Sequence, residues 1–368
     1  MRPASRPASA ARSRPSASKS TSKSARSHWL SELAAHAVIA ARLAVADAGI
    51  AEVAAPDRAG VVFGTGFGSL AESGPHYVKW AEIGDAAARP ATIPTLMLNA
   101  PRRRSPSTLA FAGPASRWRR RVARGATLSV TQCARSRRGG KTSCWRAAAE
   151  RALTELMLLS WGRLRVLSRR NDEPERASRP FDARRDGLVL ADAVVLLVLE
   201  SEDHLARRGG RALAELVGFG SNCGAGHLTA PDQASEASAM RSASKSAVWI
   251  EKTSISSSPM GPRRGATDVV EGQALREVFG DNGSFPALAA LKSMVGHSMG
   301  ASGRSAPPAA AFALESGTIP PTINLDAPDP QCQISGFAPV ATRRTLRHAV
   351  VNAFAFGGHN AVLVLRRV

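Results

Sequence analysis

Cysteine is scarce in this chain, and the few cysteines present are scattered. The four are Cys133, Cys144, Cys223 and Cys332. None forms a C-x-x-C pair, and none has a histidine partner at the spacing of a zinc site. The pattern therefore predicts neither a disulfide framework nor a bound metal. A single reactive cysteine is still compatible with it.

Long hydrophobic runs are also missing. No apolar stretch reaches the roughly 18 residues that a membrane-spanning helix needs, and the N-terminus lacks the hydrophobic segment of a signal peptide. With 368 residues, 44% of them hydrophobic, the chain can form one large core or two fused halves. We expect a globular cytoplasmic protein with no membrane segment.

Acidic residues are absent from three segments that together account for the net charge of +20. These segments are 1–28, 102–124 and 135–146, all rich in Arg, Ser, Pro, Ala and Gly. Aromatic residues make up only 5% of the chain, and few of them interleave with these charges as they would in a nucleic-acid groove. We expect solvated segments, with 1–28 disordered, in preference to a specific nucleic-acid surface.

The other segments alternate between helical and strand-like patterns. Apolar residues recur at helical spacing in 28–49 and 269–283, and a helix leading into a strand is expected at 151–160. Apolar strand patterns begin near residues 59, 187, 287 and 346, and the stretch 187–201 could form a strand pair or hairpin. This alternation indicates a layered α/β protein whose site lies at strand ends.

Glycines are dense around one histidine. The stretch LKSMVGHSMGASG (291–303) places Gly296, Gly300 and Gly303 around His297, and glycine allows bent backbone and close approach. A second glycine loop, GTGFG at 64–68, lacks the acidic partner of a dinucleotide fingerprint, so it is interpreted as a strand-to-helix turn. We therefore expect a ligand or another segment to lie close to His297.

Five segments in consistent order resemble the β-ketoacyl-acyl-carrier-protein synthases of fatty-acid and type II polyketide synthesis. They are 168–200, 218–232, 291–303, 316–330 and 350–367. The resemblance extends with gaps from about Trp29 to the C-terminus and covers roughly two-thirds of the chain. It implies a thiolase-like α/β fold of two similar halves in αβαβα layers, usually a dimer, with no cofactor.

The resemblance assigns the chemistry of acyl transfer to a few residues. In SVTQCA (129–134), Cys133 matches the nucleophile that attacks an acyl thioester. The backbone N–H groups of Cys133 and Phe356 would form the oxyanion hole, and Phe356 also matches the acyl gate. Gly357 and Gly358 form the glycine turn of the site.

The resemblance also assigns the second half-reaction, in which malonyl carrier protein loses carbon dioxide. His297 matches one of two histidines that donate to the enolate oxygen, and Lys292 matches the lysine that supports the charge network. His227 matches a residue adjacent to the pocket. The position of the second histidine, counted back from Asp268, is occupied by Met260 in this chain. Methionine cannot donate a hydrogen bond.

Several other segments depart from the family pattern. The opening strand of the family is missing, and 1–28 stands in its place. We divide the chain into 1–28, an N-terminal half at 29–200 and a C-terminal half at 201–368. The foreign segments are 102–124, 134–147, 244–267 and 303–310.

The last of these segments, with Arg304, Pro307 and Pro308, is expected to interrupt the helix after His297. We hypothesise that the foreign segments are family codons read out of frame in a GC-rich gene. Shifted translation of codons 255–267 should then contain a His-Gly pair.

The resemblance implies an acyltransferase that condenses a Cys-bound acyl chain with malonyl carrier protein by a decarboxylative Claisen reaction. The missing histidine would impair this activity. Two alternatives stay open: a non-catalytic partner subunit like a chain-length factor, and an inactive pseudoenzyme. The expected partners are an acyl carrier protein and a second ketosynthase subunit, in a homodimer or heterodimer.

Overall fold

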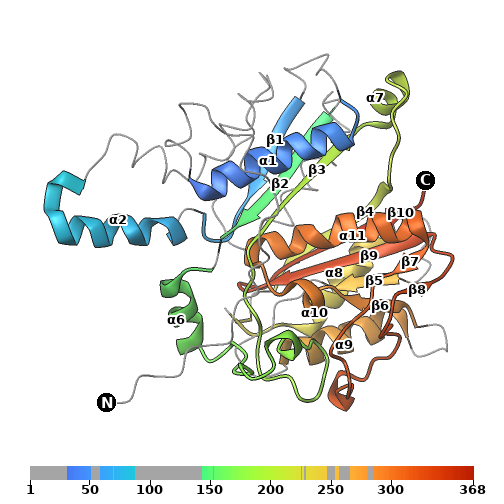
Figure 1. Cartoon of the computed structure of the whole chain (residues 1–368). Coiled ribbons are helices and arrows are strands. Elements are labelled where there is room, and N and C mark those ends of the chain that lie inside the picture. Colours follow the sequence, from blue (N-terminus) through green and yellow to red (C-terminus); the bar gives the residue numbers. More distant parts are fainter. Residues whose placement is uncertain are drawn as a thin grey trace.

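A computed structural model describes ten ranges of the chain (Figure 1). They are 31–50, 59–68, 70–87, 143–151, 153–224, 226–227, 229–246, 253–256, 266–280 and 285–368. The predicted nucleophile Cys133 and the substituted column Met260 lie outside these residues, as do 1–28 and 102–124.

The N-terminal half is built on a sheet whose described strands are β1 (Ala59–Gly64), β2 (Ser143–Glu150) and β3 (Ala193–Glu200), in that order. β1 and β2 are parallel, and β2 and β3 are antiparallel. Helix α1 (Glu32–Asp47) begins at Ser31, whose hydroxyl accepts the N–H of Ala34 at 3.1 Å. Leu33 and Ala37 of α1 pack on Phe63 and Ala149 of the sheet.

The C-terminal half contains a five-stranded sheet in the order β4-β10-β9-β5-β6. Its strands are β4 (Glu215–Cys223), β5 (Thr253–Ser256), β6 (Ala287–Ala290), β9 (His348–Ala355) and β10 (His359–Arg366). β10 pairs antiparallel with both β4 and β9, whereas β5 pairs parallel with both β9 and β6. A short ladder joins β7 (Thr318–Ile319) and β8 (Thr342–Arg343).

Helices cover both faces of the C-terminal sheet. Because side chains of a strand alternate between faces, Val351 of β9 joins the cluster that contains Leu314 of α11 (Ser302–Ser316). Its neighbour Val350 joins the opposite cluster, with Met240 of α8 (Gln233–Ser246) and Leu275 of α9 (Ala266–Phe279). Helix α11 also contacts β3, so it lies between the two sheets.

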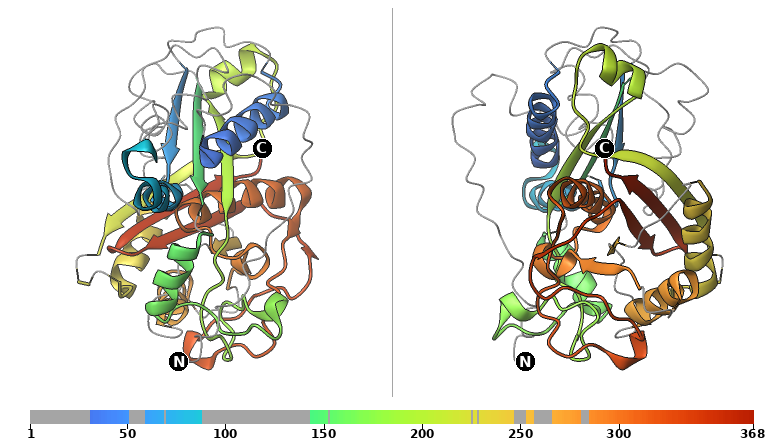
Figure 2. Two further views of the ribbon diagram at one scale, coloured as in Figure 1. Left: turned by 60° about the vertical axis from the view of Figure 1, so that its left-hand side comes forward. Right: turned by 90° about the vertical axis from the view of Figure 1, so that its right-hand side faces the viewer.

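The layers therefore follow the order α1, first sheet, α11, second sheet, and α8 with α9 (Figures 1 and 2). This confirms the expected αβαβα layering. The remaining described helices are short or peripheral: α2 (Leu70–Ile83), η3 (Gly84–Ala87), α6 (Glu155–Arg163), η4 (Pro174–Arg176), α7 (Glu202–Arg207), α10 (Lys292–Val295), η5 (Met299–Ala301) and η6 (Pro330–Cys332). Among the described residues no helix is long and apolar enough to cross a membrane.

Three local expectations were wrong. The helix after His297 is not interrupted: α11 continues through Pro307 and Pro308, because its face with Ala310 and Leu314 is buried between the sheets. Within the stretch 187–201 only β3 is a strand, Leu188 and Leu190 form isolated bridges, and there is no hairpin. After α6 no strand follows, only an isolated bridge between Leu167 and Leu188.

Candidate active site

The loop around His297 is held by backbone pairing to the N-terminal half. The N–H of His297 donates to the carbonyl of Val189 at 2.7 Å, and its own carbonyl accepts the N–H of Ala191 at 3.0 Å. Gly296 has φ +70°, and a Cβ there would lie 3.1 Å from the Val189 carbonyl. The glycine before His297 therefore provides the left-handed turn that starts this pairing, as expected.

The imidazole of His297 is buried, with 6% of the residue exposed, and its tautomer follows from its partners. Nδ1 accepts the backbone N–H of Met299 at 2.9 Å and lies 3.2 Å from the hydroxyl of Ser302. Burial, and then the positive charge of Lys292, hold the pKa of His297 well below its ordinary value. The ring is therefore neutral, and its proton is on Nε2, where it can be donated.

Lys292 lies behind this histidine in a buried charge network. The residue is 5% exposed, and burial lowers the pKa of its ammonium to about 7, although the charges of Glu271 and Asp268 act to raise it. Glu271 and Asp268 are themselves buried on α9. The structure thus brings Lys292 and His297 close enough for the lysine charge to act on the imidazole.

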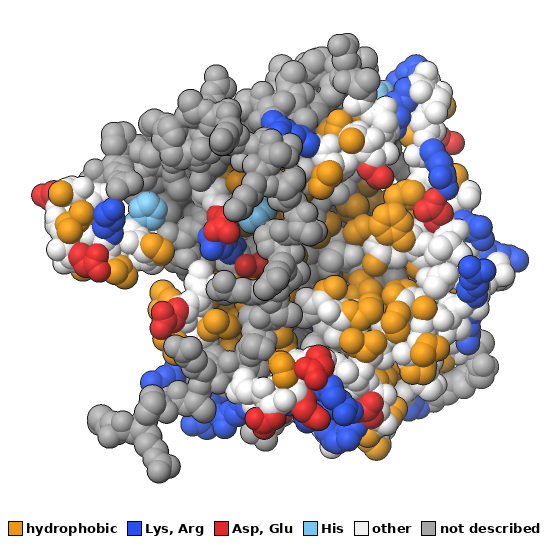
Figure 3. Space-filling view, in the orientation of Figure 1, with side chains coloured by type: hydrophobic (Ala, Val, Ile, Leu, Met, Phe, Trp, Pro, Cys, Tyr) orange, Lys and Arg blue, Asp and Glu red, His pale blue; other side chains and the backbone are white. Residues whose placement is uncertain are grey.

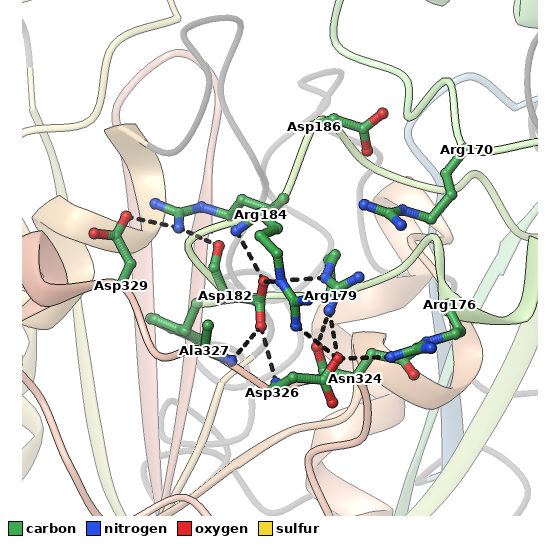
Figure 4. A network of polar contacts seen from close by, with 12 residues as sticks. Arg170, Arg176, Arg179, Asp182, Arg184, Asp186, Asn324, Asp326, Ala327 and Asp329 are labelled. Atoms are coloured by element: carbon green, nitrogen blue, oxygen red, sulfur yellow. Dashed lines mark hydrogen bonds and ion pairs between the residues drawn. The ribbon is translucent and has the colours of Figure 1, made fainter. Parts of the chain in front are cut away.

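The network continues from Asp268 into the loop that follows α6. Arg185 Nε lies 3.0 Å from Asp268 Oδ2, and a second nitrogen of Arg185 lies 2.7 Å from Asp329. In the same loop, Asp182 accepts the N–H groups of Asp326 and Ala327 at 2.9 and 2.8 Å (Figure 4). These contacts fasten the loop to the segment after β7.

Arg179 completes the attachment. Its Nε lies 3.1 Å from Asp182 Oδ1, and another of its nitrogens lies 2.8 Å from Asp326 Oδ2 (Figure 4). Because Arg179 and Asp182 are almost fully buried, the pair must keep its partners to remain stable there. Through Arg179, Asp182 and Arg185, this loop therefore connects the segment after β7 to Asp268, which belongs to the Lys292 network.

Glu150 joins the two glycine loops, and the sequence did not reveal it. Its carboxylate accepts the backbone N–H groups of Gly66 and Phe67, the latter at 3.0 Å, and that of Gly300 at 3.2 Å. The side chain is 1% exposed, and burial raises its pKa to about 7 against the lowering effect of these donors. The GTGFG loop is thus a docking element for the His297 loop.

The glycine turn between β9 and β10 presents Phe356. Gly358 has φ +69°, its carbonyl accepts the N–H of Gly224 at 2.7 Å, and a Cβ at this position would lie 1.7 Å from the Gly224 carbonyl. Only glycine fits this approach. Phe356 then lies against Trp161 of α6, with ring centroids 6.2 Å apart.

Trp161 connects this turn to the rest of the site. Its ring meets Phe67 edge-on at 6.3 Å, and the cluster that contains Trp161 also includes Met299, two residues after His297. The Phe356 turn, the GTGFG loop and the His297 loop therefore converge on one aromatic residue. The sequence does not single out Trp161, because a lone tryptophan in a helix has no pattern of its own.

His227 lies beside the pocket that Phe356 lines but does not itself enter the network. The residue is exposed, and its Nδ1 accepts the N–H groups of Thr229 and Ala230 at 3.0 and 2.9 Å. Thr229 and Ala230 line the pocket. The described part of the chain contains no cluster of side chains that could hold a metal ion.

Fold and site together define a thiolase-like protein with a neutral buried histidine, a lysine network behind it and a phenylalanine on a glycine turn. The chain belongs to the β-ketoacyl synthase family. The family profile "Beta-ketoacyl synthase, N-terminal domain" matches residues 18–204, and "Beta-ketoacyl synthase, C-terminal domain" matches 213–326.

The chain is also similar to curated 3-oxoacyl-[acyl-carrier-protein] synthases. The chain is 31% identical over 319 residues to 3-oxoacyl-[acyl-carrier-protein] synthase 2 of Synechocystis sp., covering 84% of this chain and 75% of that protein. It is 38% identical over 224 residues to the synthase 2 of Vibrio harveyi, covering 60% of this chain and 54% of that protein. The chain thus spans about half the length of the latter relative.

Solved structures confirm the thiolase-like fold. A β-ketoacyl synthase from Burkholderia phymatum STM815 superimposes with a TM-score of 0.84 at 30% identity, covering 93% of this chain and 84% of that one. The ishigamide ketosynthase/chain length factor gives a TM-score of 0.82 at 29% identity, covering 93% and 83%.

Proposed function

We propose that the chain is an acyltransferase of the condensing type that acts on carrier-bound thioesters. The Cys133 thiolate attacks the acyl thioester carbonyl, and the carrier thiol leaves. Malonyl carrier protein then loses carbon dioxide, and the resulting enolate carbon attacks the acyl group. The Cys133 thiolate leaves, and the product is a β-ketoacyl thioester on the carrier.

The observation that supports this proposal is the buried imidazole of His297, whose Nδ1 accepts the Met299 N–H. An enolate oxygen that develops as carbon dioxide leaves is stabilised by a preorganised donor in a site that excludes water. His297 is buried and neutral, and because Met299 donates to Nδ1, Nε2 carries the proton. A histidine in this state suits decarboxylation better than acid catalysis.

The two half-reactions are expected to differ in rate. Acyl loading needs the Cys133 thiolate and an oxyanion hole, for which Cys133 and Phe356 are the matched residues. Decarboxylation uses two donors in the family, and Met260 occupies the column of the second. We therefore propose efficient loading followed by weak decarboxylation.

Acylation of Cys133 tests the proposal directly. Incubation with an acyl carrier protein that bears an acyl thioester should add one acyl group to the protein, seen by intact mass, and Cys133→Ala should abolish the addition. Cys223→Ser is the matched control, because Cys223 is exposed, its Sγ lies 3.3 Å from the Gly357 carbonyl of the glycine turn, and a serine hydroxyl can keep that contact. Labelling that disappears with Cys223→Ser, or no labelling at all, would contradict the proposed catalysis.

The second candidate is a non-catalytic partner like a chain-length factor. Met260 favours it, because loss of a catalytic donor is tolerated where a subunit only shapes a pocket. The ketosynthase/chain length factor structure shows that this fold accommodates such a subunit. No acylation of the chain alone, together with altered product length when it is mixed with an active synthase, would support this candidate.

For partners, we propose an acyl carrier protein and a second ketosynthase subunit in the cytoplasm. Exposed apolar side chains support subunit contact: Leu43 on α1 is 66% exposed and Phe312 on α11 is 53% exposed. Hydrophobic side chains gather over α11 in the space-filling view (Figure 3). Sedimentation should therefore give a species heavier than one chain.

A further inference from the structure

One buried hydroxyl touches the His297 loop at two points. Ser302 is the first residue of α11, and it is 4% exposed. Its Oγ accepts the backbone N–H of Ser298 at 2.8 Å and lies 3.2 Å from Nδ1 of His297. The same atom therefore contacts both the backbone of the loop and the imidazole that the loop carries.

The other partner of Nδ1 decides the direction of the contact between Ser302 and the ring. Met299 donates its N–H to Nδ1 at 2.9 Å, so this nitrogen carries no proton and can only accept. A hydrogen bond between Ser302 and the ring must therefore use the hydroxyl proton of Ser302. Its oxygen can still accept from Ser298, because a hydroxyl has one proton and two lone pairs. The Ser298 hydroxyl, 3.2 Å from Ser302 Oγ, can donate there with its own proton.

The turn that supplies the Met299 N–H has a backbone conformation that methionine rarely adopts. Met299 has φ +44°, in the left-handed region that disfavours residues with a Cβ. Such a conformation persists only where the surrounding contacts hold it. On one side of Met299, Gly300 donates its N–H to Glu150 at 3.2 Å. On the other side Ser298 donates to Ser302, which therefore helps to keep the Met299 N–H directed at Nδ1.

The donors at Nδ1 determine what Nε2 of His297 can do. They keep the ring proton on Nε2, because the tautomer of a neutral histidine follows the hydrogen bond that its other nitrogen makes. They also fix the plane of the ring, so that Nε2–H points in one direction. A hydrogen bond accepted at Nδ1 further polarises the imidazole, which strengthens donation from Nε2. Ser302 thus acts on the donor of the proposed reaction through the far side of the ring.

The charged groups near His297 do not replace these donors. They are Lys292 on α10, Asp268 and Glu271 on α9, and Glu150 on β2. Burial, and then the charge of Lys292, lower the pKa of His297, which keeps the ring neutral but does not select the nitrogen that holds its proton. Within the described residues only Met299 and Ser302 contact Nδ1 with a donor, so they make that selection.

We propose that Ser302 is a positioning residue for decarboxylation, whose hydroxyl donates to Nδ1 of His297 and so holds the Nε2 proton in place for the enolate oxygen. This inference rests on the proposed function, because it assumes that His297 donates to an enolate. It adds a side chain to which the resemblance gave no role.

The test removes the hydroxyl and measures the two half-reactions separately. In Ser302→Ala, release of carbon dioxide from malonyl carrier protein should fall by about fivefold, the effect of losing one neutral hydrogen bond. Acylation of Cys133 should stay within about twofold, because loading does not use His297. Ser305→Ala is the matched control on the same helix, since its hydroxyl donates to the Ser302 carbonyl at 2.8 Å and it should change neither step. Thermal unfolding checks that both variants are folded.

NMR of the imidazole nitrogens reports the position of the proton directly. The resonances of His297 are those that disappear in His297→Asn. In Ser302→Ala the Nδ1 resonance should move toward that of an unprotonated nitrogen without a donor, whereas in Ser305→Ala it should not move.

The pH profile of the variant gives a third measurement. A donor to the unprotonated Nδ1 favours the neutral ring, so the loss of this donor in Ser302→Ala should raise the pKa of His297. On acidification, carbon dioxide release by Ser302→Ala should therefore begin to fall at a higher pH than release by the wild type. The wild-type profile in Ser302→Ala would contradict the proposed hydrogen bond.

Two further results would overturn the proposal. One is carbon dioxide release by Ser302→Ala at the wild-type rate. The other is slower release with an unchanged Nδ1 resonance, because Ser302 would then act through packing alone.

The outcome separates this inference from the function on which it rests. The NMR measurement is made without substrate, so it does not need Cys133. Acylation of Cys133 with an Nδ1 resonance that ignores Ser302 would refute the inference alone. An Nδ1 resonance that depends on Ser302, without acylation of Cys133, would refute the proposed catalysis and leave the hydrogen bond to His297 standing.

Discussion

The indole of Trp161 lies against the ring of Phe356, with centroids 6.2 Å apart and ring planes tilted by 30°. Trp161 belongs to α6 in the N-terminal half, whereas Phe356 follows β9 in the C-terminal half. Phe67 meets the same indole edge-on. Aromatic residues of the N-terminal half therefore contact Phe356. Under the proposed function, α6 and the GTGFG loop border the space open to the acyl chain.

Truncation of this contact should change acyl selectivity. In Trp161→Ala the space beside Phe356 enlarges, so the rate of octanoyl loading on Cys133 relative to acetyl loading should rise by roughly tenfold. Trp161→Phe keeps an aromatic ring there and should change the ratio by about twofold at most. Intact-mass time courses with the two acyl carrier substrates give the ratio.

The exposed tryptophan Trp80 on α2 supplies the control, because it is 58% exposed and Trp80→Ala should leave the ratio unchanged. If Trp161→Ala loads both acyl groups with the wild-type ratio, Trp161 does not border the acyl path.

Removal of the Lys292 charge should destabilise the protein in a pH-dependent way. Lys292→Met leaves Asp268 and Glu271 buried without that positive charge, which is expected to cost about 3–5 kcal/mol of unfolding free energy near pH 6, below the pKa of about 7 at which Lys292 loses its charge. Burial raises the pKa of Asp268, and the charges of Arg185 and then Lys292 lower it, so the variant binds protons more readily when folded. The loss should therefore shrink as the pH falls from about 6 to about 4.

Urea denaturation at the two pH values measures this loss. Lys79→Met, at an exposed position of α2, should change stability by less than about 0.5 kcal/mol at either pH. A loss at Lys292 that is the same at both pH values would mean that the buried carboxylates do not sense the lysine.

Glu150→Gln tests the junction between the two glycine loops. Burial raises the pKa of Glu150 from 4.5 to about 7, so between these values the folded protein binds a proton that the unfolded chain does not. Its stabilising contribution is complete below about pH 4.5 and is lost as the pH rises through about 7, by at most about 1.4 kcal/mol per pH unit. Glutamine does not titrate.

The stability of the wild type relative to Glu150→Gln should therefore decrease from about pH 5 to about pH 8. Unfolding free energies of both proteins across this range, measured in urea, give the difference. A difference that increases with pH would show that the ionised carboxylate is the form that the loops prefer.

The glycines around His297 predicted a bent backbone there, and Gly296 provides it with φ +70°. The roles of Lys292 and of the glycine turn at Phe356 came from the resemblance, because each lies within a single motif. Glu150 could not be found in this way, because its partners Gly66 and Gly300 lie far from it in sequence and meet it only when the sheets stack. Cys133 and Met260 lie outside the described residues, so their roles stay predictions.

For the helix after His297, the local pattern gave a wrong prediction, namely that the helix is interrupted. Two adjacent prolines argue locally for interruption, since each removes a backbone donor. In α11 they are tolerated because one face of the helix, including Ala306 and Ala313, is fully buried between the sheets. Packing that involves both halves outweighs a local preference, and no pattern within 303–310 contains that information.

Under the proposed function His297 takes part in decarboxylation and not in acyl loading, so its substitution should impair decarboxylation selectively. His297→Asn keeps an oxygen that can accept the Met299 N–H, so the loop should fold, but it removes the Nε2 donor. Release of carbon dioxide from malonyl carrier protein should fall by about a hundredfold or more, the effect of losing an oxyanion donor, whereas Cys133 acylation should stay within about threefold. Labelled carbon dioxide and intact mass measure the two steps separately.

His36→Asn, at an exposed position of α1, should leave both steps unchanged. The pKa of His297 lies well below its ordinary value, so lowering the pH from about 8 to about 6 should not protonate this ring, and residual decarboxylation by the wild type should not fall for that reason. Equal loss of loading and decarboxylation in His297→Asn would assign the residue to the shape of the pocket. A selective loss of decarboxylation would show that one neutral imidazole still works without the second donor.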